Sequence, residues 1–158
     1  MFRSLPFKII LCAFTMLLLG GVGGFLTSSS LKDWFESIEH PAGRPPNWVF
    51  GPVWSALYLM IGISFALIWH YHPQQIGKTC PTLFFLSQLI LNLLWTPVFF
   101  GLHQLEAALI IIFLMWLFIA LTVHEFAKLS KAAATLLIPY LLWVTFAIYL
   151  NAAYAWLN

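Results

Sequence analysis

The stretch "WVFGPVWSALYLMIGISFALIW", Trp48 to Trp69, decides the class of fold. It contains no Asp, Glu, Lys or Arg. A helix rises about 1.5 Å per residue, so about 20 apolar residues cross the hydrocarbon core of a membrane. The stretch is therefore predicted to be a membrane-spanning helix.

Four further runs have the same apolar character. Of the 158 residues, 62% are hydrophobic and 8% are charged, whereas about 25% of the residues in soluble domains are charged. We predict an all-α membrane protein, a five-transmembrane-helix bundle that forms a single domain over residues 1–158. The spans are expected at approximately residues 8–27, 47–70, 81–102, 105–124 and 132–157.

The first run also has the basic start and apolar centre of a signal peptide, with Arg3 and Lys8 before it. The following "GGVGGFLTSSS" contains no clear A-x-A cleavage site, and the apolar run is long for a signal. We therefore expect this run to be the first helix of the bundle.

The basic residues predict the orientation. With five spans, the N-terminus and the second and fourth loops share one side, and they contain Arg3, Lys8, Lys78, Lys128 and Lys131. Only Lys32 and Arg44 lie on the other side. The positive-inside rule then places the N-terminus in the cytoplasm of a bacterial-type inner membrane. The net charge of +2 is too small to indicate a nucleic-acid partner.

Metal-binding patterns are not found. Cys12 and Cys80 form no C-x-x-C motif and match no zinc spacing. The five histidines fall at helix ends or in loops, and none forms an i, i+4 pair inside a span. We expect no metal, no cofactor and no ligated haem.

Three of the predicted spans carry stripes of aromatic and polar residues. Trp54 and Tyr58 are four residues apart in the second span, and Asn92 and Trp95 are three apart in the third. Residues at these spacings are neighbours on a helix surface. The fifth span carries a longer stripe, formed by Tyr140, Trp143, Ala147, Asn151 and Tyr154. Three stripes of the same kind predict a shared cavity.

Asn92 is the most informative polar residue of the spans. A buried amide without a partner is costly, so Asn92 must face other helices. It can form an interhelical hydrogen bond, worth about 0.6 kcal/mol on average in membranes, or it can anchor a ligand in an apolar pocket. The sequence leaves both interpretations open.

Three segments of the sequence resemble motifs of a known family. "WFESIEHPAGRPPNWVFGPVWSALYLMIG" (34–62), "LNLLWTPVFFG" (91–101) and "LLIPYLLWVTFAIYLN" (136–151) are similar to motifs of the translocator protein family, also called tryptophan-rich sensory proteins or peripheral-type benzodiazepine receptors. The resemblance covers all five helices in order. It implies a bundle, usually a homodimer, with a cavity open toward the first loop. Family ligands include porphyrins, sterols and benzodiazepine-type drugs.

The resemblance also implies a binding site. Residues 28–46 of the first loop would form a lid, although a rigid interfacial loop without a ligand role is the plain alternative. Asn47 can cap the second helix. The implied ligand-binding residues are Phe35, Pro45, Val49, Trp54, Tyr58, Asn92, Trp95, Tyr140, Trp143, Ala147, Leu150 and Asn151.

The sequence departs from the family pattern at two places. Gly43 stands where many relatives have Trp, so the lid has one aromatic side chain fewer. The sterol motif of animal relatives requires Leu or Val, then Tyr, then a basic residue. Leu150 and Tyr154 are present, but the chain ends in "AWLN" without a basic residue. A sterol stays a possible ligand with an incomplete motif.

Three functions are compatible with this pattern. The first is a membrane protein that binds and senses porphyrins. The second is an enzyme for light- and oxygen-dependent breakdown of protoporphyrin IX, for which the resemblance implies Trp54 and Trp143 as catalytic residues. The third is an active transporter, ranked last because the apolar interiors of the spans contain no Asp, Glu, Lys, Arg or His that could couple ion movement.

Overall fold

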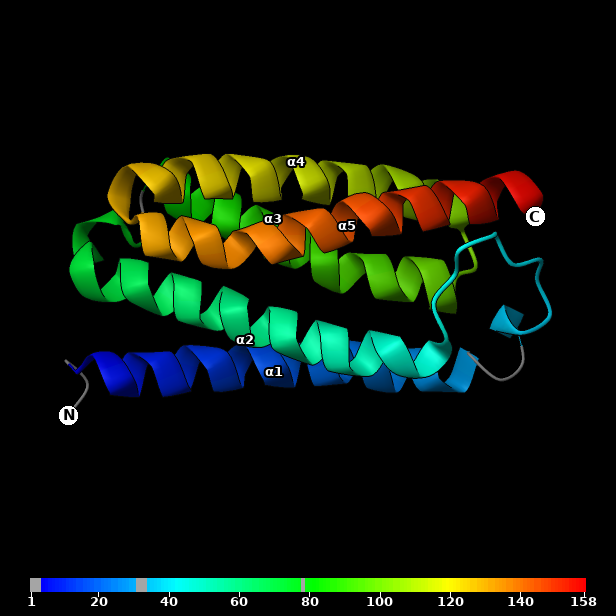
Figure 1. The fold of residues 1–158 in the computed structure, drawn as a ribbon, viewed down its shortest axis with the longest axis horizontal. Helices are drawn as coiled ribbons and strands as arrows, with labels where there is room; N and C mark the ends of the chain where they lie inside the picture. The colour runs from blue at the N-terminus through cyan, green and yellow to red at the C-terminus, as the bar shows by residue number, and fades with distance from the viewer. Residues whose placement is uncertain (1–3, 31–33, 78) are drawn as a thin grey trace.

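The chain folds into five long helices that lie side by side (Figure 1). The computed structural model describes residues 4–30, 34–77 and 79–158, and these contain helices and loops but no strand. The predicted all-α class is confirmed. The helices are α1 (Leu5–Ser30), α2 (Asn47–Tyr71), α3 (Cys80–Thr96), α4 (Leu105–Leu129) and α5 (Lys131–Leu157).

Each helix, with α3 taken through to Gly101, is long and apolar enough to cross a membrane. Helix α4 runs to Leu129, past the expected end at residue 124. Its last turns carry Glu125 and Lys128, which pair at 2.6 Å. The apolar run therefore ends before the helix does, because the final turns are charged.

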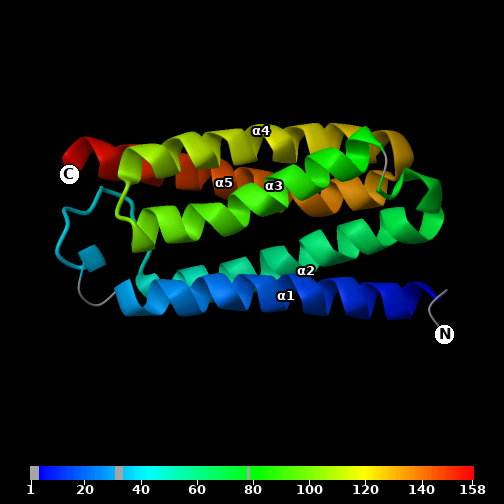
Figure 2. The same cartoon turned by 180° about the vertical axis from the view of Figure 1, so that it is seen from behind.

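The helices pack in a defined order. Helix α1 lies against α2, α4 lies against both α3 and α5, and α2 also contacts α5 (Figures 1 and 2). An odd number of spans puts the two ends of the chain at opposite ends of the bundle (Figure 1). The first loop lies at the same end as the C-terminus. Arg3, Lys32 and Lys78, which contribute to the predicted orientation, are outside the described residues.

Helix α2 begins differently from the expectation. Pro46 occupies the N-cap position, and no side chain caps the helix. Asn47 is the first helical residue, and its side-chain oxygen accepts a hydrogen bond from the guanidinium of Arg44. The expected Asn47 cap is wrong because the preceding prolines start the helix one residue earlier and leave the amide facing the loop.

Two glycines allow α1 and α2 to approach closely. A Cβ atom added at Gly62 of α2 would lie 2.6 Å from the backbone Cα of Ala13 in α1. A Cβ atom at Gly20 of α1 would lie 2.2 Å from the ring of Tyr58. Neither position has room for a larger residue, so these glycines fix the distance between the two helices.

Candidate ligand cavity

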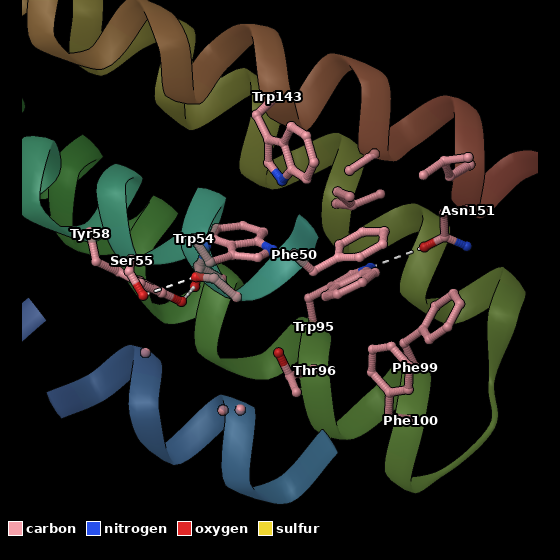
Figure 3. A pocket seen from close by; sticks show the side chains of 18 of the residues that line it. Phe50, Trp54, Ser55, Tyr58, Trp95, Thr96, Phe99, Phe100, Trp143 and Asn151 are labelled. Carbon is pink, nitrogen blue, oxygen red and sulfur yellow. Dashed lines mark hydrogen bonds between the residues drawn. The ribbon is translucent and has the colours of Figure 1, made fainter. Parts of the chain in front are cut away.

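A cavity of about 490 Å³ lies in the half of the bundle nearest the first loop (Figure 3). All five helices contribute to its lining, together with Phe35 of the first loop. The contributing parts are the C-terminal halves of α1, α3 and α5 and the N-terminal halves of α2 and α4. These halves meet at one end because neighbouring helices run in opposite directions.

Three indole rings line the cavity from three different helices. Trp54 comes from α2, Trp95 from α3 and Trp143 from α5 (Figure 3). Phe50 packs edge-on against Trp143 with ring centroids 5.8 Å apart. The centroid of Trp54 lies 5.5 Å from that of Tyr58. The predicted stripes of α2, α3 and α5 therefore face one shared space.

A ladder of hydrogen bonds closes the inner end of the cavity. The hydroxyl of Tyr58 donates to Oδ1 of Asn92 at 2.6 Å, and Nδ2 of Asn92 donates to the hydroxyl of Tyr140 at 3.0 Å. The hydroxyl of Tyr140 donates to Oε1 of Gln88 at 2.9 Å. Asn92 thus forms the interhelical bonds of one interpretation and also lines the cavity, as the other requires.

Asn151 holds a second polar contact near the mouth. Its Oδ1 accepts from Nε1 of Trp95 at 3.0 Å, and its Nδ2 donates to the backbone carbonyl of Leu105 at 2.9 Å. The amide is 2% exposed and joins α3, α4 and α5. The indole nitrogen of Trp95 is therefore satisfied by protein, and the face of its ring is left for packing against a ligand.

Contacts from α5 and from Asn158, which follows it, hold the first loop over this end of the bundle. The hydroxyl of Tyr149 donates to the carbonyl of Ala42 at 3.1 Å. The backbone N–H of Glu39 donates to Oδ1 of Asn158 at 2.8 Å. Phe35 is buried, and its ring packs against Tyr154 with centroids 5.3 Å apart. The loop therefore covers this end of the bundle; its role in ligand binding stays a prediction.

Three of the predicted site residues lie outside the lining. Tyr140 is fully buried below the inner end, where its hydroxyl forms hydrogen bonds with Asn92 and Gln88. Pro45 and Val49 are half-buried at the loop and the first turn of α2. The other predicted residues line the cavity: Phe35, Trp54, Tyr58, Asn92, Trp95, Trp143, Ala147, Leu150 and Asn151.

Two of the unpredicted groups of lining residues come from α1 and from the turn after α3. Helix α1 contributes a glycine face, made of Gly20, Gly21, Gly23 and Gly24. A π-helical turn at Pro97–Gly101 follows α3 and brings Phe99 and Phe100 to the cavity. The search for stripes of aromatic and polar side chains could not detect glycines. The "GGVGG" pattern at residues 20–24 did indicate that another group could approach this helix closely.

The described lining residues are all uncharged and mostly apolar. None of them is Asp, Glu, Lys, Arg or His. Within residues 4–30, 34–77 and 79–158, no group of three or more His, Cys, Asp or Glu residues could hold a metal ion. The chemistry of the site is therefore aromatic stacking and apolar contact, with a few hydrogen-bonding groups.

The fold and the cavity together define a membrane-spanning helical bundle that encloses an aromatic ligand pocket. The chain belongs to the TspO/MBR family, whose model matches residues 11–157. It is an integral membrane protein that crosses the bilayer several times.

Its relatives come from all three domains of life. The chain is 38% identical over 152 residues to the Tryptophan-rich protein TspO of Chlorobaculum tepidum, covering 94% of both chains. It is 37% identical over 154 residues to the protein of the same name from Archaeoglobus fulgidus, covering 96% of this chain and 97% of the relative. It is 34% identical over 143 residues to the Translocator protein of Bos taurus, covering 85% and 82%.

Proposed function

We propose that this protein binds porphyrins and other flat hydrophobic ligands in the cavity, and that it senses tetrapyrroles in the membrane. One observation carries the proposal: Trp54, Trp95 and Trp143 surround a single apolar space that also contains the amide of Asn92. Large flat π-systems stack well on indole rings. A mostly apolar pocket with a few placed polar groups is the usual form of a small-molecule site.

The size and chemistry of the cavity support this class of ligand. Its volume of about 490 Å³ falls within the range of about 300–1,000 Å³ typical of ligand pockets. No described lining residue is a histidine that could serve as an axial ligand. This favours a metal-free porphyrin over a histidine-ligated haem. Benzodiazepine-type drugs would occupy the same space, and a sterol is a weaker candidate because its motif is incomplete.

The names of two relatives support a sensing or carrying role rather than a purely structural one. A relative from Cereibacter sphaeroides, 37% identical over 79% of this chain, is called a Tryptophan-rich sensory protein. The bovine relative is called a Translocator protein. We further propose a homodimer in a bacterial inner membrane, with the N-terminus in the cytoplasm.

The experiment is a titration in darkness. Purified protein in nanodiscs is titrated with protoporphyrin IX, and the absorption band of the porphyrin is followed. We expect a saturable change that a benzodiazepine-type drug reverses. A change that rises without saturation, equal to that of empty nanodiscs, would show partition into lipid and contradict the proposal.

A second function is favoured by the positions of Trp54 and Trp143. Both line the cavity, from α2 and α5, so both could contact one bound porphyrin. A photoexcited porphyrin with oxygen could then be degraded, with the indoles taking part in redox steps. The lining contains no acid or base among its described residues, so ordinary acid–base catalysis is not proposed.

Phenylalanine substitutions test this second function. The Trp54→Phe/Trp143→Phe double variant should lose light-dependent porphyrin loss while keeping its helical content, because Phe retains apolar packing but lacks the indole. The measurement is porphyrin fluorescence over time in light and in darkness. An unchanged rate of loss in the double variant would eliminate the enzymatic function in this form.

A further inference from the structure

The first loop makes a sharp turn directly beside the cavity mouth. The backbone N–H of Arg44 donates to the carbonyl of Pro41 at 3.4 Å, and Gly43 between them has a φ of 80°. Glycine adopts this left-handed conformation without the steric cost of a Cβ atom. Gly43, which stands where many relatives have Trp, thus provides no aromatic side chain, but it allows the turn that positions Arg44.

The guanidinium of Arg44 is held between two residues of the cavity lining. Its Cζ lies 4.9 Å from the ring centroid of Phe35, in a cation–π contact. One of its terminal nitrogens donates to Oδ1 of Asn47. Because Phe35 and Asn47 both line the cavity, the positive charge of Arg44 is fixed at the edge of an otherwise uncharged space.

Arg44 forms no salt bridge within the described part of the chain, although Glu36 and Glu39 belong to the same loop. The ion pair found among the described residues joins Lys128 and Glu125, in the last turns of α4. Nε of Arg44 is buried and has no hydrogen-bond partner among the described residues. Burial and the charge of Arg44 lower the pKa of the neighbouring His40, against the opposing effect of Glu36. With His40 neutral, Arg44 is the cation that the described residues place at the mouth.

We propose that Arg44 is an anion subsite that binds a carboxylate of an amphipathic ligand whose apolar body occupies the cavity. The inference rests on the proposed porphyrin-binding function and names the functional group that the mouth recognises. Guanidinium groups bind carboxylates with paired, charge-assisted hydrogen bonds. The N-terminus of α2, which begins at Asn47, adds a favourable potential for an anion at the same place.

The plain alternative is that Arg44 only stabilises the closed loop through Phe35 and Asn47. The two roles differ in what they require of the ligand. A purely structural Arg44 would affect acidic and neutral ligands equally, whereas an anion subsite discriminates between them. Protoporphyrin IX carries carboxylates that its dimethyl ester lacks, so this pair of probes separates the two roles.

The experiment measures the affinity of both probes for four proteins in nanodiscs of zwitterionic lipid. The proteins are the wild type, Arg44→Gln, Arg44→Lys and Lys131→Gln. Lys131 is exposed at the start of α5, at the opposite end of the bundle, so its variant removes one positive charge away from the mouth. Circular dichroism and thermal midpoints verify that each variant is folded.

We expect the wild type to bind the free acid more tightly than the ester. Arg44→Gln should weaken binding of the acid about five- to tenfold, the scale of one hydrogen-bonded charge at a partly exposed site, and leave the ester within about twofold. Arg44→Lys should keep only part of the preference, because lysine retains the charge but not the paired hydrogen bonds of a guanidinium, and Lys131→Gln should keep all of it. Added salt should reduce the wild-type preference by screening.

Two results would overturn the inference while leaving the proposed function intact. In the first, the wild type binds acid and ester equally. In the second, Arg44→Gln weakens both probes by the same factor, which would assign Arg44 to loop stability. Failure of the wild type to bind either probe would contradict the proposed function itself, and the anion subsite with it.

Discussion

At the scale of the residue, two asparagines position the aromatic walls of the cavity. Asn92 binds Tyr58 and Tyr140, and Asn151 binds Trp95 and the carbonyl of Leu105. Each amide uses both its oxygen and its nitrogen, so each fixes the relative position of several helices. Since the surroundings are apolar, a partner lost from either amide could not be replaced by water from the bilayer.

Removal of the Tyr140 hydroxyl should therefore destabilise the bundle. Tyr140→Phe leaves Nδ2 of Asn92 without its acceptor and Oε1 of Gln88 without its donor, both in buried positions. We expect the free energy of unfolding to fall by about 1 kcal/mol, between the membrane average for one such bond and the full cost of an unpaired buried group.

The measurement for Tyr140→Phe is the midpoint of denaturation in detergent. Tyr71→Phe is the matched control, because the Tyr71 side chain is exposed at the end of α2. Equal midpoints for the two variants would show that the ladder contributes nothing to stability.

The site could be predicted in part from single residues. Large aromatic and amide side chains repeated at helical spacing, and these lie in the cavity. Tyr140 belongs to the same stripe but lies below the cavity, because a stripe cannot show where along a helix the open space ends. Pro45 lies outside the lining because a loop has no fixed period that relates sequence to direction, and Val49 in the first turn of α2 also lies outside it. The glycine face of α1 produced no stripe.

At the scale of the element, the five long apolar runs without charged residues were sufficient to predict five helices. They could not predict where each helix ends, because α4 continues into charged turns at Glu125 and Lys128. They also could not predict the π-helical turn after Thr96. The widened turn that begins at Pro97 places Phe99 against the Phe35 ring, with centroids 6.2 Å apart.

The contact between α1 and α2 depends on Gly62. A methyl group there would meet the backbone of Ala13, which cannot rotate away as a side chain could. Gly62→Ala should lower the free energy of unfolding by about 1–3 kcal/mol, the usual cost of overpacking.

Gly21→Ala is the control for Gly62→Ala. An added Cβ at Gly21 meets nothing within 4 Å, and alanine is the better helix former by about 1 kcal/mol. The control should be neutral or stabilising in the same denaturation assay. Destabilisation of equal size in both variants would argue against backbone contact as the cause.

At the scale of the whole molecule, the bundle has an open half and a packed half. The half away from the first loop is filled by stacked rings, with Phe65 and Phe85 at 4.5 Å and Phe85 and Phe126 at 5.9 Å between centroids. The cavity therefore lies in the half of the bundle that the first loop covers, and the side of the membrane on which that end lies is set by the orientation of the protein.

The proposed orientation can be measured with a membrane-impermeant maleimide. Cys80 is exposed at the start of α3, at the end of the bundle that contains the N-terminus, whereas Cys12 is buried. We expect Cys80 to react in inside-out vesicles and to be protected in intact spheroplasts. A Cys80→Ser/Ala42→Cys variant, which moves the thiol to the first loop, should show the reverse. The opposite pattern in both proteins would show that the N-terminus lies outside the cytoplasm and would contradict the proposed orientation.

The central claim is that the ligand lies between the helices, against the fifth-helix stripe. Ala147 lines the cavity one turn after Trp143, whereas Ala152 on the same helix is exposed. Threonine at position 147 adds bulk inside the cavity and can bend the helix by bonding back to the carbonyl of Trp143. Since overpacking costs about 1–3 kcal/mol, the affinity should fall about tenfold or more.

The most direct test is a protoporphyrin IX titration of the wild type, Ala147→Thr and Ala152→Thr, followed by quenching of tryptophan emission. The account predicts weaker binding, about tenfold or more, for Ala147→Thr alone, with all three proteins equally helical. Wild-type affinity in a folded Ala147→Thr protein would contradict it, because the porphyrin would then bind elsewhere than in the cavity.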